Sequence, residues 1–469
     1  MAFHLRLRGM TGSCHQLTRH IHIPTSTPTQ TQTQRVTVTA TRNWGSSYRH
    51  YSQARQWNTR TLATVSDRTP TPNRPVVSSS PGFLNFRYDD RDVNVKRTKL
   101  PNLWLRDNCR CSACVNQDTM QRNFNSFELP ELIQPLRIES NQVGVRVHWS
   151  ETTSHESFYP WEFIEHYLKF DKRSPEEVQV KYFGAYGHLD SFVECEEIES
   201  NEAAAVGRLT DLIRRNGFAF ITGVPYATAE PTQKLLEKIA FIRQTHYGGF
   251  YDFIPDLSLA DTAYTNLPLG AHTDTTYFSD PVGLQALHLL SHVGPELKNG
   301  LGATLGGKSL LVDGFYAAGL LKAEDPEAYD ILSSVKLPWH ASGNKGITIT
   351  PDNLYPVFEN NEITGKLHRI RWNNDDRGVV PFDGKYTPWE WYDAAKKWNE
   401  VLRRKSVEYW FQLRPGEILI FDNWRVLHGR SAFTGVRRMC GGYINRDDFI
   451  SRWRNTNYAR DDVLKRVIG

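Results

Sequence analysis

Acidic residues and lysine are absent from the first 65 residues of this 469-residue chain. The same stretch contains eight arginines, spaced apart, among many serine, threonine and glutamine residues. An arginine-rich, hydroxyl-rich leader without acidic residues is typical of mitochondrial transit peptides. A disordered basic tail that binds nucleic acid is the alternative. We favour import because lysine is absent and the arginines are spaced. We therefore assign residues 1–65 to a transit peptide and the protein to the mitochondrial matrix.

The chain also lacks any run of about 18 consecutive apolar residues, which argues against a transmembrane helix. Its formal net charge of +4 comes from the arginine-rich leader, so the remainder is near neutral and gives no basis for binding nucleic acid. We therefore expect neither a membrane nor nucleic acid as a partner. With 39% hydrophobic and 12% aromatic residues, the chain can bury one large core and the core of a small accessory domain.

Cysteine is scarce, with six residues in the whole chain, yet three of them are Cys109, Cys111 and Cys114 within LRDNCRCSAC. Some forty residues later, the alternating strand VRVHW leads to a turn that contains His155. Three thiolates and one imidazole form the closed tetrahedral site of structural Zn(II), which would stabilise a small sheet with little core. We therefore predict a mostly β, zinc-stabilised domain at residues 83–167, after a Pro/Ser-rich linker at residues 66–82.

Three alternatives to this zinc site remain open. The cysteines could form disulfides, although a matrix protein keeps its thiols reduced. They could also be core residues without a ligand. His148, on the strand before His155, could replace His155 as the fourth ligand.

Residues 194–469 combine short buried strands with flanking helices. A helical pattern through NEAAAVGRLTDLIRRNG ends at Gly217, where glycine suits the position after a helix. Thr387, Pro388 and Glu390 begin another helix with a capping box. Strands are expected at FAFITGVP, GLQALHLLSH, SLLVD, EILIFD and MCGGYINRDDF, with which the chain closes. The pattern predicts a mostly β fold with flanking helices, a double-stranded β-helix (jelly-roll) core, beside the small N-terminal β domain.

A His-x-Asp pair, His272 and Asp274, lies within AHTDTTYF. Positions i and i+2 of a strand point to the same face, so both side chains can reach one ion. With one distant histidine they would form the two-histidine, one-carboxylate site of non-haem Fe(II) oxygenases. The pair alone is a weak signal, because His188 and Asp190 form a second copy.

His428 is our choice for the distal histidine, 156 residues beyond His272 and just after the buried strand EILIFD. The residues downstream of His428 favour it, because Arg437 and Arg438 come nine and ten residues later. The alternatives are His288, His292, His340 and His368.

Arg437 predicts the co-substrate. A guanidinium can bind a carboxylate bidentately, and an oxygenase that uses 2-oxoglutarate needs such a group for the far carboxylate of that molecule. Arg437 should point inward if Tyr443 does, because odd positions share one face of a strand. Ser309, after a Gly-Gly turn, is a candidate hydroxyl partner for the same carboxylate.

Tyrosines predict the chemistry of the substrate. Aromatic faces bind a quaternary ammonium ion, which has no N–H group to donate, through cation–π attraction. Any one of these tyrosines is more readily interpreted as a core residue, but as a set they predict a cage. The set consists of Tyr247, Tyr251, Tyr264 and Tyr443.

Several long strings resemble the γ-butyrobetaine and trimethyllysine dioxygenase family of Fe(II)- and 2-oxoglutarate-dependent enzymes. They are WLRDNCRCSAC, AHTDTTYF, LLVDGFYAA and FDNWRVLHGRSAFTGVRRMCGGYINRDD, and the likeness extends from about Phe83 to the C-terminus. It implies Fe(II) at His272, Asp274 and His428, 2-oxoglutarate at Arg437, and a trimethylammonium cage at the four tyrosines. It also implies that Asn373 and Asn374 lie near the carboxylate of the substrate. Tyr251, where the butyrobetaine branch has tryptophan, and an insertion at residues 295–307 depart from the family pattern.

The resemblance implies that the chain hydroxylates Nε,Nε,Nε-trimethyllysine at carbon 3, the first step of carnitine biosynthesis. The reaction consumes O2 and 2-oxoglutarate, releases succinate and CO2, and uses ascorbate as reductant. γ-Butyrobetaine is the alternative substrate; it lacks the α-amino group that Asp252 or Asp261 could bind. A non-enzymatic module that binds methylated amines is the alternative of a different class. We take a homodimer as the working hypothesis for the oligomeric state, on which the sequence itself gives no information.

Overall fold

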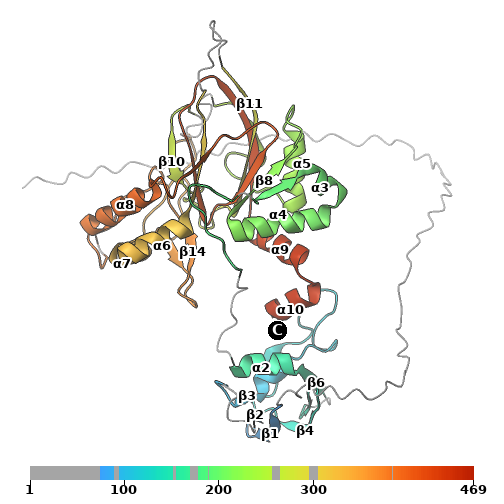
Figure 1. Ribbon diagram of the computed structural model, residues 1–469. Coiled ribbons are helices and arrows are strands. Elements are labelled where there is room, and N and C mark those ends of the chain that lie inside the picture. Colours follow the sequence, from blue (N-terminus) through green and yellow to red (C-terminus); the bar gives the residue numbers. More distant parts are fainter. Residues whose placement is uncertain are drawn as a thin grey trace, which may run out of the picture. The chain divides into compact units, whose positions relative to one another are not determined.

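Figure 1 presents the computed structural model of the chain, which describes residues 74–88, 95–151, 155–169, 178–188, 190–255, 265–294, 305–382 and 384–468. The predicted transit peptide lies outside these ranges, as do Tyr264 and Asp261. Within them, no helix has both the length and the apolar character needed to cross a membrane.

The N-terminal module contains, among its described residues, two antiparallel three-stranded sheets. The first is built of β1 (Val76–Ser80), β2 (Phe83–Arg87) and β3 (Lys99–Pro101), and the second of β4 (Pro135–Ser140), β5 (Gly144–Trp149) and β6 (His155–Pro160). The helices are α1 (Asn102–Asp107), the short 3-10 helix η1 (Ser126–Glu128) and α2 (Trp161–Lys169). Trp149, Tyr159 and Ile164 are buried in a core that belongs to this module.

The predicted linker is wrong over its last part, because residues 76–80 form β1 and pair with β2. Pro81 and Gly82 make the two-residue turn between these strands, and Gly82 has a φ of +78°. Proline presets φ at the first central position of a turn, and glycine accepts a positive φ at the second. The sequence carried no signal for this strand, because β1 is mostly exposed and is defined by its pairing with β2 rather than by an apolar pattern of its own.

The larger module contains, in its described part, two main sheets. The six-stranded sheet has the order β7-β8-β16-β11-β18-β9, and the four-stranded sheet has the order β10-β17-β12-β15. The strands of the first are β7 (Phe192–Glu194), β8 (Phe218–Thr222), β16 (Ile418–Asp422), β11 (Leu284–Val293), β18 (Val436–Ile444) and β9 (Tyr251–Phe253). Those of the second are β10 (Leu269–His272), β17 (Val426–Arg430), β12 (Ser309–Asp313) and β15 (Tyr409–Phe411).

Alternating side chains divide each strand between two cores. In β16, Leu419 and Phe421 join a cluster between the two sheets, together with Leu311 of β12. Ile418 and Ile420 point the other way, into a cluster formed with the helices. The strands predicted from apolar runs therefore form because both of their faces are buried.

Helices cover the outer faces of both sheets (Figure 1). Against the six-stranded sheet lie α3 (Cys195–Ser200), α4 (Glu202–Asn216), α5 (Glu230–Ile239) and α9 (Arg446–Asn457). Against the four-stranded sheet lie α6 (Gly314–Glu324), α7 (Pro326–Ser334) and α8 (Pro388–Leu402), beside the hairpin of β13 (Phe358–Asn360) and β14 (Leu367–Ile370). Both predicted helix boundaries are confirmed, since Gly217 ends α4 with a φ of +87° and Thr387 caps α8 with a complete capping box.

The end of the chain differs from the prediction. The last strand, β18, is followed by α9 and by α10 (Arg460–Ile468). The helix α9 is rich in charged residues and buries only a narrow stripe that includes Phe449 and Trp453. A narrow stripe of this kind is a weak periodic signal, so the charged sequence concealed the helix.

Candidate functional site

His272, Asp274 and His428 converge at one point. In the antiparallel pair of β10 and β17, His272 lies directly opposite His428, and the centroids of the two rings are 4.2 Å apart. The Oδ1 atom of Asp274 lies 3.3 Å from Nε2 of His272 and 3.7 Å from Nε2 of His428. One ligand atom from each residue falls within 4.8 Å of the other two, which suits a single ion with bonds of roughly 2 Å.

The electrostatics of the three side chains also suit a cation. Burial opposes a charge on His272, but its hydrogen bond and attraction to Asp274 outweigh burial and raise its pKa to about 9. Burial opposes ionisation of Asp274, yet His428 and His272 hold its pKa well below the usual range. Burial and the neighbouring His272 lower the pKa of His428 to about 3. Asp274 is thus an ionised carboxylate and His428 a neutral imidazole, which are the ligand forms of these groups. The raised pKa of His272 means that this residue has to release a proton when a cation binds, as is usual when metals bind to protein ligands.

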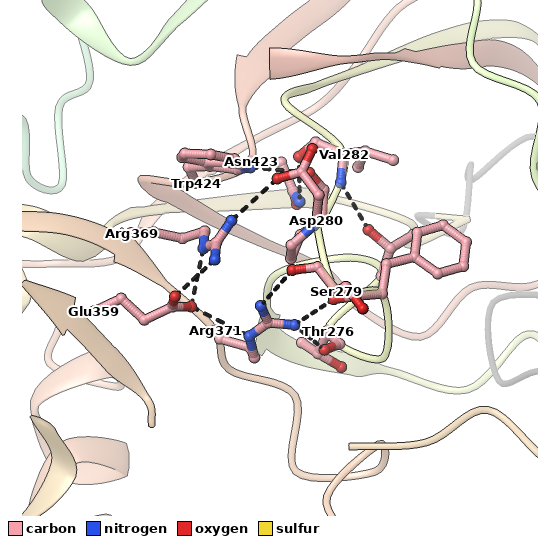
Figure 2. Close-up of polar contacts among 12 residues, drawn as sticks. Thr276, Ser279, Asp280, Val282, Glu359, Arg369, Arg371, Asn423 and Trp424 are labelled. Carbon is pink, nitrogen blue, oxygen red and sulfur yellow. Dashed lines mark hydrogen bonds and ion pairs between the residues drawn. The ribbon is translucent and has the colours of Figure 1, made fainter. Parts of the chain in front are cut away.

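Asn423 and Tyr443 hold Asp274 in place. Its backbone N–H donates to Oδ1 of Asn423 at 2.8 Å, and the amide of Asn423 donates back to its carbonyl at 3.0 Å. The Tyr443 hydroxyl donates to Oδ2 at 2.7 Å, and because burial and the charge of Asp274 raise its pKa, it keeps that proton. Figure 2 shows the loop that follows Asp274, with Arg371 and Arg369 directed at it.

Arg437 is a buried guanidinium in a cavity of about 320 Å³ that the three histidine and aspartate side chains also line. Burial, with the nearby Arg430, lowers its pKa to about 10, which still leaves it charged at neutral pH. Within the described residues it makes no hydrogen bond or ion pair, and its Nε atom is buried without a partner. Ser309 lines the same cavity. Buried charges are normally paired, so this geometry calls for an anion from outside the chain.

The inward direction of Arg437 follows the expected alternation. Arg437, Met439 and Tyr443 all line the cavity, whereas Arg438 points outward and forms an ion pair with Asp252. Asp252 is therefore occupied on the outer face and does not line the cavity. Among the described residues, the acidic side chains that line it besides Asp274 are those of Asp375 and Asp376.

Aromatic side chains form one wall of the cavity. Tyr247, Tyr251 and Tyr443 line it, and the rings of the last two lie 5.7 Å apart at 65°. Tyr264 lies outside the described residues. Asn373 lines the cavity, whereas Asn374 is exposed and does not.

The alternative histidines lie elsewhere. His288 is fully buried between Thr232 and the backbone of residue 416, and the ring of His292 is 2.8 Å from the Thr434 carbonyl. His340 lines the mouth of the cavity without joining the triad, and the ring of His368 packs on Trp424. In the second His-x-Asp pair, Asp190 is exposed and pairs with Lys181.

Several residues of the cavity were missed in the sequence, Asp375 and Asp376 among them. Arg430 and Gln285 could have been found by period-two alternation, since Arg430 lies two residues after His428 and Gln285 faces Tyr443 in register. Tyr277 and the loop 340–344 carried no such signal, because loop geometry brings them to the cavity.

The cysteine cluster also converges. The Sγ atoms of Cys109, Cys111 and Cys114 lie 3.4, 3.8 and 3.4 Å from Nε2 of His155. Tetrahedral zinc with its usual bond lengths keeps sulfur and nitrogen about 3.5 Å apart. His148 interacts instead with Glu156 at 3.3 Å, and the three cysteines form no disulfide.

Comparison with known proteins identifies the family. A family model described as "Taurine catabolism dioxygenase TauD, TfdA family" matches residues 183–443. The chain belongs to the TauD, TfdA dioxygenase family. It is accordingly a 2-oxoglutarate-dependent dioxygenase, which acts on a small molecule with O2. A second model, "Gamma-butyrobetaine hydroxylase-like, N-terminal", matches residues 79–165.

Relatives of this TauD-family chain carry a more specific name. A trimethyllysine dioxygenase from Neurospora crassa is 58% identical over 80% of this chain and 84% of its own length. One from Meyerozyma guilliermondii is 38% identical over 82% of this chain and 98% of its own. The human protein, named "Trimethyllysine dioxygenase, mitochondrial", is 36% identical over 75% of this chain and 81% of its own.

Proposed function

We propose that the chain hydroxylates Nε,Nε,Nε-trimethyllysine at carbon 3 and converts 2-oxoglutarate and O2 to succinate and CO2, as the first step of carnitine biosynthesis. The relatives named for this activity support it over most of the chain. The observation that carries the proposal is one cavity that combines a His-Asp-His triad, an unpaired buried arginine and an aromatic wall.

Each group of residues has its own task at this site. Fe(II), held by His272, Asp274 and His428, would supply the activation of O2. Arg437, with Ser309, binds the far carboxylate of 2-oxoglutarate and so orients its keto acid end toward the triad. The hydroxyl of Tyr443 holds Asp274 through Oδ2 and leaves Oδ1 directed at the two histidines.

The aromatic wall binds and orients the substrate. Tyr247, Tyr251 and Tyr443 offer ring faces to the trimethylammonium group, with Tyr264 as a fourth member, and they exclude water from the reacting carbon. Asn373, which lines the cavity, binds the carboxylate of the substrate, whereas Asn374 is exposed and takes no part.

The direct test replaces the triad. In His272→Ala or Asp274→Ala, we expect loss of succinate formation and of hydroxylated product, measured by mass spectrometry on anaerobically reconstituted protein. His292→Ala, which removes a histidine outside the triad, is the matched control and should retain activity. Undiminished turnover in either triad variant would refute the assignment.

γ-Butyrobetaine is the alternative substrate, with the same chemistry. The carboxylates of Asp375 and Asp376 at the cavity would attract the α-ammonium group of trimethyllysine and so increase its affinity. γ-Butyrobetaine has no α-amino group and would lack this attraction. Offering both compounds in one reaction and comparing the hydroxylated products decides between them. If iron is bound but neither compound stimulates 2-oxoglutarate consumption, the chain is instead a binding module.

Further parts of the proposal concern the setting of the reaction. We propose that the two main sheets form a double-stranded β-helix, that the protein works in the mitochondrial matrix as a homodimer, and that ascorbate keeps its iron reduced. We also propose structural Zn(II) at Cys109, Cys111, Cys114 and His155. Matrix location is checked by cell fractionation, the dimer by sedimentation, and both metals by elemental analysis.

A further inference from the structure

The loop Thr273–Asp280, which carries Asp274, is folded onto the segment that follows strand β14. Arg371, just past the end of this strand, is fully buried. Its guanidinium donates to the carbonyl groups of Thr276, Phe278 (2.7 Å) and Ser279 (3.4 Å). Figure 2 shows this side chain on the inner side of the curve of the loop. One side chain therefore satisfies three carbonyl groups of a loop that has no strand partner for them.

A carboxylate on strand β13 holds this guanidinium. Oε1 of Glu359 lies 3.3 Å from Nε of Arg371, and both carboxylate oxygens also accept hydrogen bonds from Arg369, at 2.9 and 2.6 Å. Arg369 reaches the end of the loop as well, where it donates to Asp280 at 3.2 Å. Arg369 and Arg371 thus bind residues 276–280 of the loop, and both arginines are paired with Glu359 of strand β13 (Figure 2).

The start of the loop is held by the same segment. The N–H of Thr273 donates to the Trp372 carbonyl at 2.7 Å, and the N–H of Trp372 donates to the Thr273 hydroxyl at 3.0 Å. Asp274 lies between these two attachments, and Thr275 next to it has a φ of +56°. A non-glycine residue with positive φ persists only when its surroundings hold it there.

We propose that Arg371, held by Glu359, is a positioning residue that sets the direction in which Asp274 presents its carboxylate to the metal. Arg371 does not line the cavity, so it acts through the loop alone. A planar fork of N–H donors can meet several carbonyls and a carboxylate at once, which a lysine ammonium does less well and an apolar residue of similar size not at all. The inference rests on the proposed metal site, although not on the identity of the substrate.

Variants of the full-length protein test this role. Arg371→Met should weaken the affinity of the protein for Co(II), followed by its absorption spectrum, by about 10- to 100-fold, the usual effect of losing an outer-shell partner. It should also speed hydrogen exchange in residues 273–280 and produce succinate in excess over hydroxylated product. Arg371→Lys should recover part of the Co(II) affinity.

A matched control separates positioning from general stability. Arg425 is also buried, pairs with Asp313 at 2.7 Å, and donates to the carbonyls of Lys181 and Arg215. Within the described residues, none of its side-chain hydrogen bonds or ion pairs reaches the loop. Arg425→Met should lower the melting temperature and leave Co(II) affinity near that of the wild type.

The outcomes are distinct. Wild-type Co(II) affinity and loop exchange in Arg371→Met, or an equal loss of affinity in Arg425→Met, would overturn the proposal. If Arg371→Met does not fold, Arg371→Lys and Glu359→Gln carry the same comparison. A wild-type protein that binds Co(II) but hydroxylates neither substrate overturns the proposed function, while the affinity comparison still decides the role of Arg371.

Discussion

The surroundings of single side chains indicate what binds to them, and Arg437 is the strongest case. Its charge is buried, the charged neighbour that helps to lower its pKa is another arginine, and no described residue offers it a hydrogen bond. A charge-assisted hydrogen bond contributes about 1.5–3 kcal/mol, or roughly 10- to 100-fold in affinity. Arg437→Leu should therefore raise the KM for 2-oxoglutarate by about that factor, measured by succinate formation at saturating substrate.

The matched variant is Arg437→Lys, which keeps the positive charge but loses the two parallel N–H donors that bind a carboxylate bidentately. It should give an intermediate KM for 2-oxoglutarate. The KM for the quaternary ammonium substrate should change little in both variants. A rise confined to that second KM would contradict the assignment of Arg437 to the co-substrate.

His288 predicts a pH dependence of folding. Its Nε2 atom accepts a hydrogen bond from the N–H of Gly416 at 3.1 Å, so Nδ1 carries the proton and donates to Thr232 at 2.7 Å. Burial lowers its pKa to about 4. The unfolded chain, with an ordinary histidine pKa near 6.5, binds the proton first as pH falls, so stability decreases from about pH 6.5 to 4.

The size of this effect is up to about 3 kcal/mol, at 1.36 kcal/mol per pKa unit. The measurement is the free energy of unfolding in urea at several pH values. His288→Leu should be less stable throughout but should show a flatter dependence between pH 6.5 and 4. Equal slopes in the two proteins would show that another group titrates.

At the scale of elements, α8 offers a prediction about one helix end. The Thr387 hydroxyl accepts from the N–H of Glu390, and the Glu390 carboxylate accepts from the N–H of Thr387 at 2.7 Å. Trp391 and Trp398 of this helix are buried in the core over the four-stranded sheet. Thr387→Ala should cost about 1 kcal/mol of unfolding free energy, and Thr387→Ser should cost much less. Urea titration compares the two; an equal cost would mean that the cap contributes nothing.

Elements were predictable from sequence where local pattern and burial agree. The strand EILIFD and helix α8 follow from their apolar residues and cap. The His-x-Asp motif pointed to the correct pair of residues, but the expected shared strand face is wrong, because β10 ends at His272 and Asp274 lies in the loop that follows. Strand β1 and helix α9 were missed because pairing and a narrow buried stripe, not composition, define them. Arg371 could not be predicted, because its three carbonyl partners meet only after the loop has folded. Asn374 was expected near the carboxylate of the substrate, but its side chain is exposed and does not line the cavity.

For the whole molecule, the N-terminal module and the larger module have separate hydrophobic cores. Loss of the metal from one module should therefore lower the stability of that module and leave the other unchanged. We expect one zinc per chain and its loss in Cys114→Ser, since the closed site needs all four ligands. Hydrogen exchange should then lose protection in β5 while β16 stays protected. The control is Cys195→Ser, a buried cysteine outside the cluster. A wild-type protein without zinc, or unchanged protection in β5 of the variant, would contradict the expectation.

The direct pairing of His272 with His428 has a consequence for how such chains can vary in length. The two residues are neighbours across a ladder, although 156 positions separate them. Insertions or deletions in the connecting loops between them therefore leave their distance unchanged. A single residue added within β17 between Val426 and His428 would instead turn the imidazole to the opposite face of the sheet. Length changes among natural relatives should accordingly gather in the loops and avoid this strand.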